Sequence, residues 1–239
     1  VILCWKPNRA WVRPLLAAGL LVTASAALAD ILVVRSTGPS AGSFPPGRRL
    51  PENARISLRA GDQLVLLDGR GTRNVRGPGT FTAGIPPAGQ VASSGPASQR
   101  RSRIGAVRGA GAGELRPPSL WHVDVARSSD VCVAAPSKPV LWRADAARAV
   151  TLDIGGPGSR TSRVAWAAGS STLAWPSDLP VADGAQYRLS WPGAKVPTIL
   201  RFRTLPRTPA GLEDMAQALI SNRCEAQLDH FIETVKLPG

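Results

Sequence analysis

The sequence has few of the residues that build catalytic and metal sites. Only two histidines, His122 and His230, occur among 239 residues, and the three cysteines, Cys4, Cys132 and Cys224, lie far apart. No cluster of histidine, cysteine and carboxylate has the spacing of a metal site. Serine is common, but no nucleophile-elbow motif surrounds one. This scarcity favours a non-catalytic protein without a cofactor over a hydrolase.

Acidic residues are also scarce. They number 16 against 29 lysines and arginines, which gives a formal net charge of +13. No run of basic residues is long enough to form a nucleic-acid-binding arm, so we expect no nucleic-acid partner. Most of the basic residues are arginine, which suits bidentate binding of phosphate or carboxylate. The alternative is a compositional bias that uses arginine in place of lysine throughout.

No apolar stretch is long enough to span a membrane. The uninterrupted stretch 15–28 is shorter than the roughly 20 residues that a bilayer requires. It follows three basic residues and ends in "ALA" before Asp30, the pattern of a signal peptide over residues 1–29. We expect cleavage there rather than a retained anchor, and a periplasmic or secreted protein. Loss of the three basic residues would lower the net charge from +13 to +10.

Glycine (24) and proline (22) make up about a fifth of the chain, which favours short strands and turns over long helices. Residues 30–82 contain the β-rich runs "ILVV", "ARISL" and "QLVLLD", which indicate a small antiparallel β domain. Residues 83–117 have almost no apolar periodicity and predict a flexible linker. The linker carries candidate ligands for an anionic partner: Arg100, Arg101, Arg103 and Arg108.

Residues 118–207 alternate strand-like runs with polar turns. Eight such runs recur about every ten residues, from "WHVDVA" to "TILRFRTL", which predicts an immunoglobulin-like β-sandwich. Residues 208–239 differ, because apolar residues there recur at helical spacing on either side of a break near "SNR". With Thr208 as a cap and Pro209 in the first position, we expect two short helices packed on the sandwich. The fold class is therefore mainly β with a C-terminal helical pair.

The stretch "RAGDQLVLLDGRGTRNVRGPGTF", residues 59–81, could cradle an anion or turn short strands. A phosphate loop needs a lysine and a hydroxyl after its glycines, and neither is present. The glycines therefore predict turns, with the arginines on solvated edges. The progression of "GD", an apolar strand, "DG" and "GPG" resembles the extracytoplasmic domain of FecR-like proteins, as does "SRIGAVRG" (102–109) more weakly. The resemblance implies a periplasmic β module without the signalling role of FecR, because the cytoplasmic portion of that family has no counterpart here.

The aromatic residues of the sandwich allow two interpretations. The layout "LPVADGAQYRLSW" matches a tyrosine corner, in which the hydroxyl of Tyr187 pins a loop; the alternative is that it contacts a ligand. Trp121 and Trp175 lie beside loops and are the best candidates for a stacking platform, if there is one. The other three tryptophans of this region fit inward-facing core positions: Trp142, Trp166 and Trp191.

Cys132 and Cys224 are the two cysteines that remain once the signal peptide is removed. An exported protein enters an oxidising compartment, so we expect them to form a disulfide rather than two buried thiols. Two functions remain open. The first is an accessory protein of the bacterial envelope whose FecR-like β module docks a protein partner. The alternative is a binder of an anionic envelope polymer, peptidoglycan or lipopolysaccharide, through the arginine-rich linker and tryptophan loops.

Overall fold

The computed structural model describes Val1 and residues 30–85, 116–135 and 137–237. The expected signal peptide and the four linker arginines lie outside these residues. The described chain is mainly β with two C-terminal helices, so the predicted fold class is confirmed. Within it, neither helix is long and apolar enough to cross a membrane.

Residues 30–85 form two small antiparallel sheets. One is four-stranded in the order β2-β1-β4-β5, and β3 pairs with β6 in the other. Glycines turn the chain where the sequence predicts, because Asp68 to Gly71 closes the β4–β5 hairpin and Gly71 adopts φ +146°. The strands are β1 (Asp30–Thr37), β2 (Arg49–Pro51), β3 (Arg55–Leu58), β4 (Gln63–Asp68), β5 (Gly71–Arg76) and β6 (Gly79–Thr82), with a 3-10 turn at η1 (Ala41–Ser43).

The residues after the linker form a β-sandwich, and each of the eight predicted strands is present. A five-stranded sheet in the order β11-β10-β13-β14-β8 faces a three-stranded sheet in the order β12-β9-β7. Two pairs are parallel, β8 with β14 and β7 with β9. The strands are β7 (His122–Asp124), β8 (Ser129–Ala134), β9 (Val140–Trp142), β10 (Val150–Gly155), β11 (Thr161–Trp166), β12 (Thr172–Ala174), β13 (Gln186–Ser190) and β14 (Thr198–Leu205), with a 3-10 turn at η2 (Pro157–Ser159).

The tail forms α1 (Gly211–Ser221) and α2 (Glu225–Thr234), separated at the predicted "SNR" break. The predicted cap is wrong. Ala210, with an extended backbone, precedes the first helical residue, and Gly211 adopts φ +84°, so the chain turns after Pro209 before the helix starts. Thr208 therefore lies outside the helix, and α1 has no side-chain cap.

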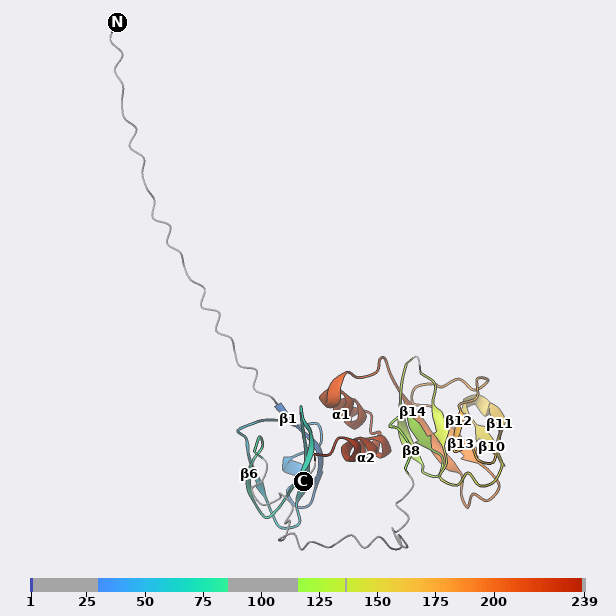
Figure 1. The fold of residues 1–239 in the computed structure, drawn as a ribbon, viewed down its shortest axis with the longest axis horizontal. Helices are drawn as coiled ribbons and strands as arrows, with labels where there is room; N and C mark the ends of the chain where they lie inside the picture. The colour runs from blue at the N-terminus through green and yellow to red at the C-terminus, as the bar shows by residue number, and fades with distance from the viewer. Residues whose placement is uncertain (2–29, 86–115, 136, 238–239) are drawn as a thin grey trace, which may run out of the picture.

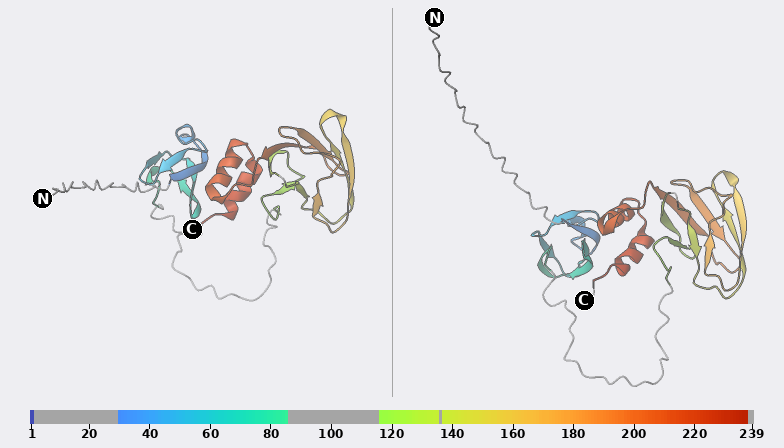
Figure 2. Two further views of the ribbon diagram at one scale, coloured as in Figure 1. Left: turned by 90° about the horizontal axis from the view of Figure 1, so that it is seen from above. Right: turned by 45° about the horizontal axis from the view of Figure 1, so that its top comes forward.

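The helical pair lies between the N-terminal sheet and the sandwich (Figures 1 and 2). α1 contacts β1 and β4, and α2 contacts β8. The helices therefore pack on both units. A shared apolar cluster joins Leu32 and Leu67 of the N-terminal sheet, Leu205 of the sandwich and the helical residues Leu219 and Leu228.

Two strands are buried on both faces because they lie between a β core and the helices. In β1, Ile31 and Val33 enter the N-terminal core, while Leu32 faces the helices. In β8, Val131 enters the sandwich core, while Cys132 faces the helices. Successive side chains of a strand point to opposite faces, so each strand needs an uninterrupted apolar run.

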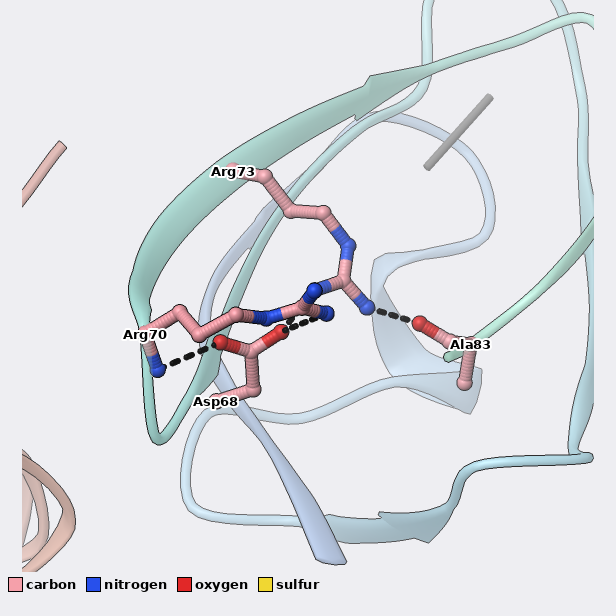
Figure 3. A network of polar contacts seen from close by, with 4 residues as sticks. All are labelled: Asp68, Arg70, Arg73 and Ala83. Carbon is pink, nitrogen blue, oxygen red and sulfur yellow. Dashed lines mark hydrogen bonds and ion pairs between the residues drawn. The ribbon is translucent and has the colours of Figure 1, made fainter. Parts of the chain in front are cut away.

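One arginine of the 59–81 stretch is not on a solvated edge. The side chain of Arg73 is 8% exposed, and its Nη1 donates to the Asp68 carboxylate at 2.5 Å while its Nη2 donates to the Ala83 carbonyl oxygen (Figure 3). The Arg70 backbone N–H donates to the same carboxylate at 2.8 Å. The prediction that these arginines lie on solvated edges is wrong for Arg73, because its side chain links the β4–β5 turn to the end of β6.

Candidate ligand-binding site

A cleft of about 970 Å³ opens at one end of the sandwich. The residues there follow the ends of strands that are separate in the sequence: the turn after β9, the start of β10, the end of β11 and the turn after β13. The strand ends contribute mostly apolar side chains to the cleft, and the turn after β9 contributes the charged ones. The resulting cleft is mostly apolar, with two arginines and one acid: Arg143, Arg148 and Asp145.

Arg143 is the most constrained charged group of this cleft. It is 7% exposed, its Nε donates to the Ser170 carbonyl oxygen at 3.1 Å, and its Nη2 donates to that of Ala167 at 2.7 Å. Its guanidinium lies 4.7 Å from the ring centroid of Trp166, a cation–π contact. No ion pair among the described residues joins Arg143 to an acid. The guanidinium is therefore fixed in place while its charge lacks a described counter-ion.

Trp166 supplies a second donor. It is 2% exposed and lines the cleft, and its Nε1 has no hydrogen-bond partner in the described structure. Most buried polar groups in proteins are hydrogen-bonded, so each exception requires an explanation. Trp191 also lines the cleft, where it is half-buried and packs partly against the sandwich core. The cleft thus combines an aromatic surface with donors that lack acceptors.

The predicted stacking platform is not at this cleft. Trp175 is 4% exposed, its Nε1 donates to the Leu179 carbonyl oxygen at 2.6 Å, and it packs edge-on against Tyr187. It is a core residue, so its prediction as a ligand-binding residue is wrong. Trp121 is half-buried against the helical cluster. Trp191, expected at a core position, packs against the sandwich core but is only partly buried, because the turn "WPG" follows it at once.

The tyrosine corner is confirmed. The Tyr187 hydroxyl donates to the Pro180 carbonyl oxygen at 2.7 Å and accepts the N–H of Ala182 at 3.2 Å. The ring is 1% exposed. The hydroxyl therefore pins the loop before β13, and it lies in the core rather than in the cleft.

A second hollow, of about 430 Å³, lies between α2, the N-terminal sheet and the start of the sandwich. It brings together His122 of β7 and His230 of α2, which are far apart in the sequence. Burial, followed by the nearby charges of Arg116 and His122, lowers the pKa of His230. The Ser119 hydroxyl and Nδ1 of His122 are 2.7 Å apart. The hollow therefore gathers polar groups from both units.

These groups form neither a triad nor a metal site. Asp124 accepts the N–H of Ala126 at 2.9 Å, and no hydrogen bond joins its carboxylate to His122 in the described chain. Among the described residues, no three histidines, cysteines or acids are grouped so as to hold a metal ion. Ser119 and His122 are neighbours in a turn, where the hydroxyl also accepts the N–H of Trp121 at 3.4 Å. A structural role explains this contact.

The cysteines lie at bonding distance. Cys132 on β8 and Cys224, which precedes α2, have Cα atoms 5.8 Å apart and are joined as a disulfide. The bond connects the helical pair to the edge strand of the larger sandwich sheet. The linker candidates Arg100, Arg101, Arg103 and Arg108 lie outside the described residues.

Fold and site together define a class: a disulfide-linked, mainly β protein with a sandwich, a helical pair and an open cleft at the sandwich end. Comparison of the chain with protein-family models, with curated proteins and with solved structures finds no match. What the protein does must therefore be inferred from the cleft itself.

Proposed function

We propose that the chain is an exported, non-catalytic accessory protein of the bacterial envelope, in which a FecR-like β module is joined to a sandwich that binds a partner protein. The sandwich-end cleft carries this proposal. It is an apolar hollow at the open end of a rigid scaffold, with an accessible tryptophan and a few fixed polar groups, which is the usual composition of a binding site. The disulfide supports export, because such bonds persist in oxidising compartments.

A protein partner is favoured over an anionic polymer. The polymer hypothesis used Trp175, which is buried, and Trp121, which packs on the helices, together with the linker arginines. The cleft instead offers apolar walls and an aromatic rim, which resemble the centre of a protein–protein interface. Binding there depends on apolar contact and should persist in salt, whereas binding driven by counterion release weakens steeply.

Site-specific crosslinking in cells tests this function. A photo-crosslinking phenylalanine analogue at Ala149, on the cleft, should yield an adduct with one envelope protein. The same analogue at Arg160 is the matched control, because Arg160 is exposed beside the β10–β11 turn at the opposite end of the sandwich. The partner identified by mass spectrometry should then bind the purified protein and lose affinity for Trp191→Ala.

Equal adducts at the two positions, or none at either, would contradict the proposal. A polymer ligand would give a different salt dependence of binding. The protein would be retained on peptidoglycan or lipopolysaccharide at low salt and released at high salt, and Trp191→Ala would not change retention.

A further inference from the structure

The charges at the sandwich-end cleft are unbalanced. Arg143 and Arg148 line it against a single acid, Asp145, whose Oδ1 accepts the N–H of Ala147 at 2.9 Å. Arg148 and Asp145 are both exposed and so retain their water. Arg143 has lost most of its water without gaining an acid, and a buried charge is costly unless it is paired. An occupant with a negative charge would remove that cost.

The geometry of Arg143 selects among anions. Two of its nitrogen atoms, Nε and Nη2, already donate to the 167–170 turn. Nη1 takes part in no hydrogen bond among those of the described residues, so it is the atom left for a ligand. Nε1 of Trp166, on the side chain beneath the guanidinium, likewise lacks an acceptor. One or two donors suit a carboxylate, while a phosphate monoester usually collects more.

The walls of the cleft indicate which kind of molecule would carry the carboxylate. The accessible apolar walls are formed by Ala144, Ala149, Val150 and Ala165, with Trp191 at the rim. Asp145 and Thr151 are the only side chains of the lining that can accept a hydrogen bond from a hydroxyl. An oligosaccharide would lose water from many hydroxyls there, and the lining offers their O–H donors only these two side-chain acceptors. A bulky apolar side chain fits the same surface without that cost.

We propose that the sandwich-end cleft recognises an acidic peptide segment, in which a bulky apolar side chain enters between Val150 and Trp191 and a neighbouring carboxylate reaches Arg143. The proposal rests on the proposed function and names the chemistry of the partner. The net charge supports it, since the sequence carries +13 in full and +10 without residues 1–29, and a basic protein attracts an acidic partner at long range.

Synthetic peptides test the chemistry directly. The probes are acetylated and amidated hexapeptides, Ala-Ala-Phe-Glu-Ala-Ala and its forms with Gln in place of Glu or Ala in place of Phe. Binding is followed by titration calorimetry and by the ¹H–¹⁵N signal of the Trp166 indole, assigned with Trp166→Phe. The Phe-Glu peptide should shift that signal, and its Gln form should bind about tenfold more weakly, because a hydrogen bond to a charged group is lost.

Variants of the protein separate binding from folding. Replacement of Arg143 also disturbs the 167–170 turn, so the exposed Arg148→Gln and the half-buried Trp191→Ala carry the test. Trp191→Ala should lower affinity by about tenfold or more, since tryptophan contributes strongly at interfaces. Arg148→Gln should lower it by about threefold at low salt and less at high salt. Arg160→Gln, at the far end of the sandwich, should change nothing.

Three outcomes would overturn the proposal: no peptide shifts the Trp166 signal, the Gln form binds as well as the Glu form, or an oligouronate binds while the peptides do not. The last would assign an acidic glycan instead. Failure here is distinct from failure of the proposed function. A protein adduct at Ala149 without peptide binding would support the proposed function and exclude an acidic peptide as the ligand. Peptide binding without an adduct in cells would support the acidic-peptide ligand and contradict the proposed function.

Discussion

The helical pair is attached to its two neighbours in different ways. On the sandwich side, a disulfide and a buried amide reinforce the apolar contact. On the side of the N-terminal sheet there is no disulfide among the described residues, and the apolar contact is supplemented by a buried hydrogen bond from the Thr72 hydroxyl to the Ile232 carbonyl oxygen, a short tail segment beside β5 and surface ion pairs. Covalent and buried contacts persist in salt, while exposed ion pairs are weak and screened. We therefore expect the contact between the helices and the N-terminal sheet, the dock of the N-terminal unit, to open more easily than the disulfide-linked contact with the sandwich.

The largest expected effect comes from removing the disulfide. The bond closes a loop with a sequence separation of 92, so the Cys132→Ala/Cys224→Ala variant should lose about 4 to 5 kcal/mol of unfolding free energy in the chain-entropy model. Chemical denaturation of the wild-type protein with and without reductant gives the same comparison without a mutation. Two free thiols in freshly exported, denatured protein would show that the bond does not form.

The second effect concerns Gln227, which is 7% exposed. Its Oε1 accepts the N–H of Cys132 at 2.6 Å and its Nε2 donates to the Cys132 carbonyl oxygen at 3.0 Å, so the amide acts as a strand partner for the open edge of β8. Gln227→Leu leaves both backbone groups unpaired and should cost about 3 kcal/mol by denaturant melts. Gln217→Leu, on α1, is the control. Equal losses in the two variants would mean that the amide has no special role.

The third effect tests the dock of the N-terminal unit. The N–H of Thr72 donates to the Val235 carbonyl oxygen at 2.9 Å, and a Cβ on Gly71 would lie 2.3 Å from that oxygen. Gly71→Ala should therefore displace the tail, cost about 1 to 2 kcal/mol and speed amide exchange at Leu237. Gly69→Ala is the matched control, because a Cβ there meets nothing within 4 Å. Unchanged exchange at Leu237 in Gly71→Ala would contradict the dock.

The sequence predicts the strands well because their signal is local. Each of the eight sandwich runs is a strand, and "DG" and "GPG" mark turns, since side-chain alternation and turn residues act over a few positions. The uninterrupted runs 31–34 and 131–134 also carried the information that β1 and β8 are buried on both faces. Because a strand buried on both faces needs a second layer to cover it, these two runs could have predicted that the helices pack between the two units.

The candidate site was not predicted because its parts are distant in the sequence. Arg143 and Trp191 directly follow β9 and β13, Trp166 is the last residue of β11, and each alone has the pattern of a strand end. Arg73 was misplaced for a similar reason, since its acceptor at Ala83 belongs to another strand end. Trp175, one of the two tryptophans beside loops, is covered by residues distant in the sequence, such as Phe202, which the local pattern does not show.

Acid should loosen the N-terminal unit through Asp68. Burial alone raises the pKa of this carboxyl, but hydrogen bonds from the Arg70 backbone and the Arg73 side chain outweigh it and hold the pKa below its ordinary value of 3.8. A lowered folded-state pKa adds stability that is present above pH 3.8 and is lost as the pH falls through the folded value. Asp68→Asn should be less stable at pH 7 and should lose less than the wild type between pH 4 and pH 2. An unchanged pH profile would contradict this role.

The smallest effect is expected from the ion pairs at the dock. Arg35 on β1 pairs with Asp229 and, at 3.5 Å, with Glu225 of α2, and all three side chains are at least a third exposed. Arg35→Gln should therefore cost less than about 1 kcal/mol at low salt and nothing measurable near 1 M salt. Arg163→Gln, which removes an exposed pair within the sandwich, is the control for a general loss of charge. If the dock is separable, Arg35→Gln combined with Gly71→Ala should release the N-terminal unit, seen as faster amide exchange in β1 and β4 while β8 stays protected. Equal exchange in β1 and β8 would mean that the two attachments do not differ.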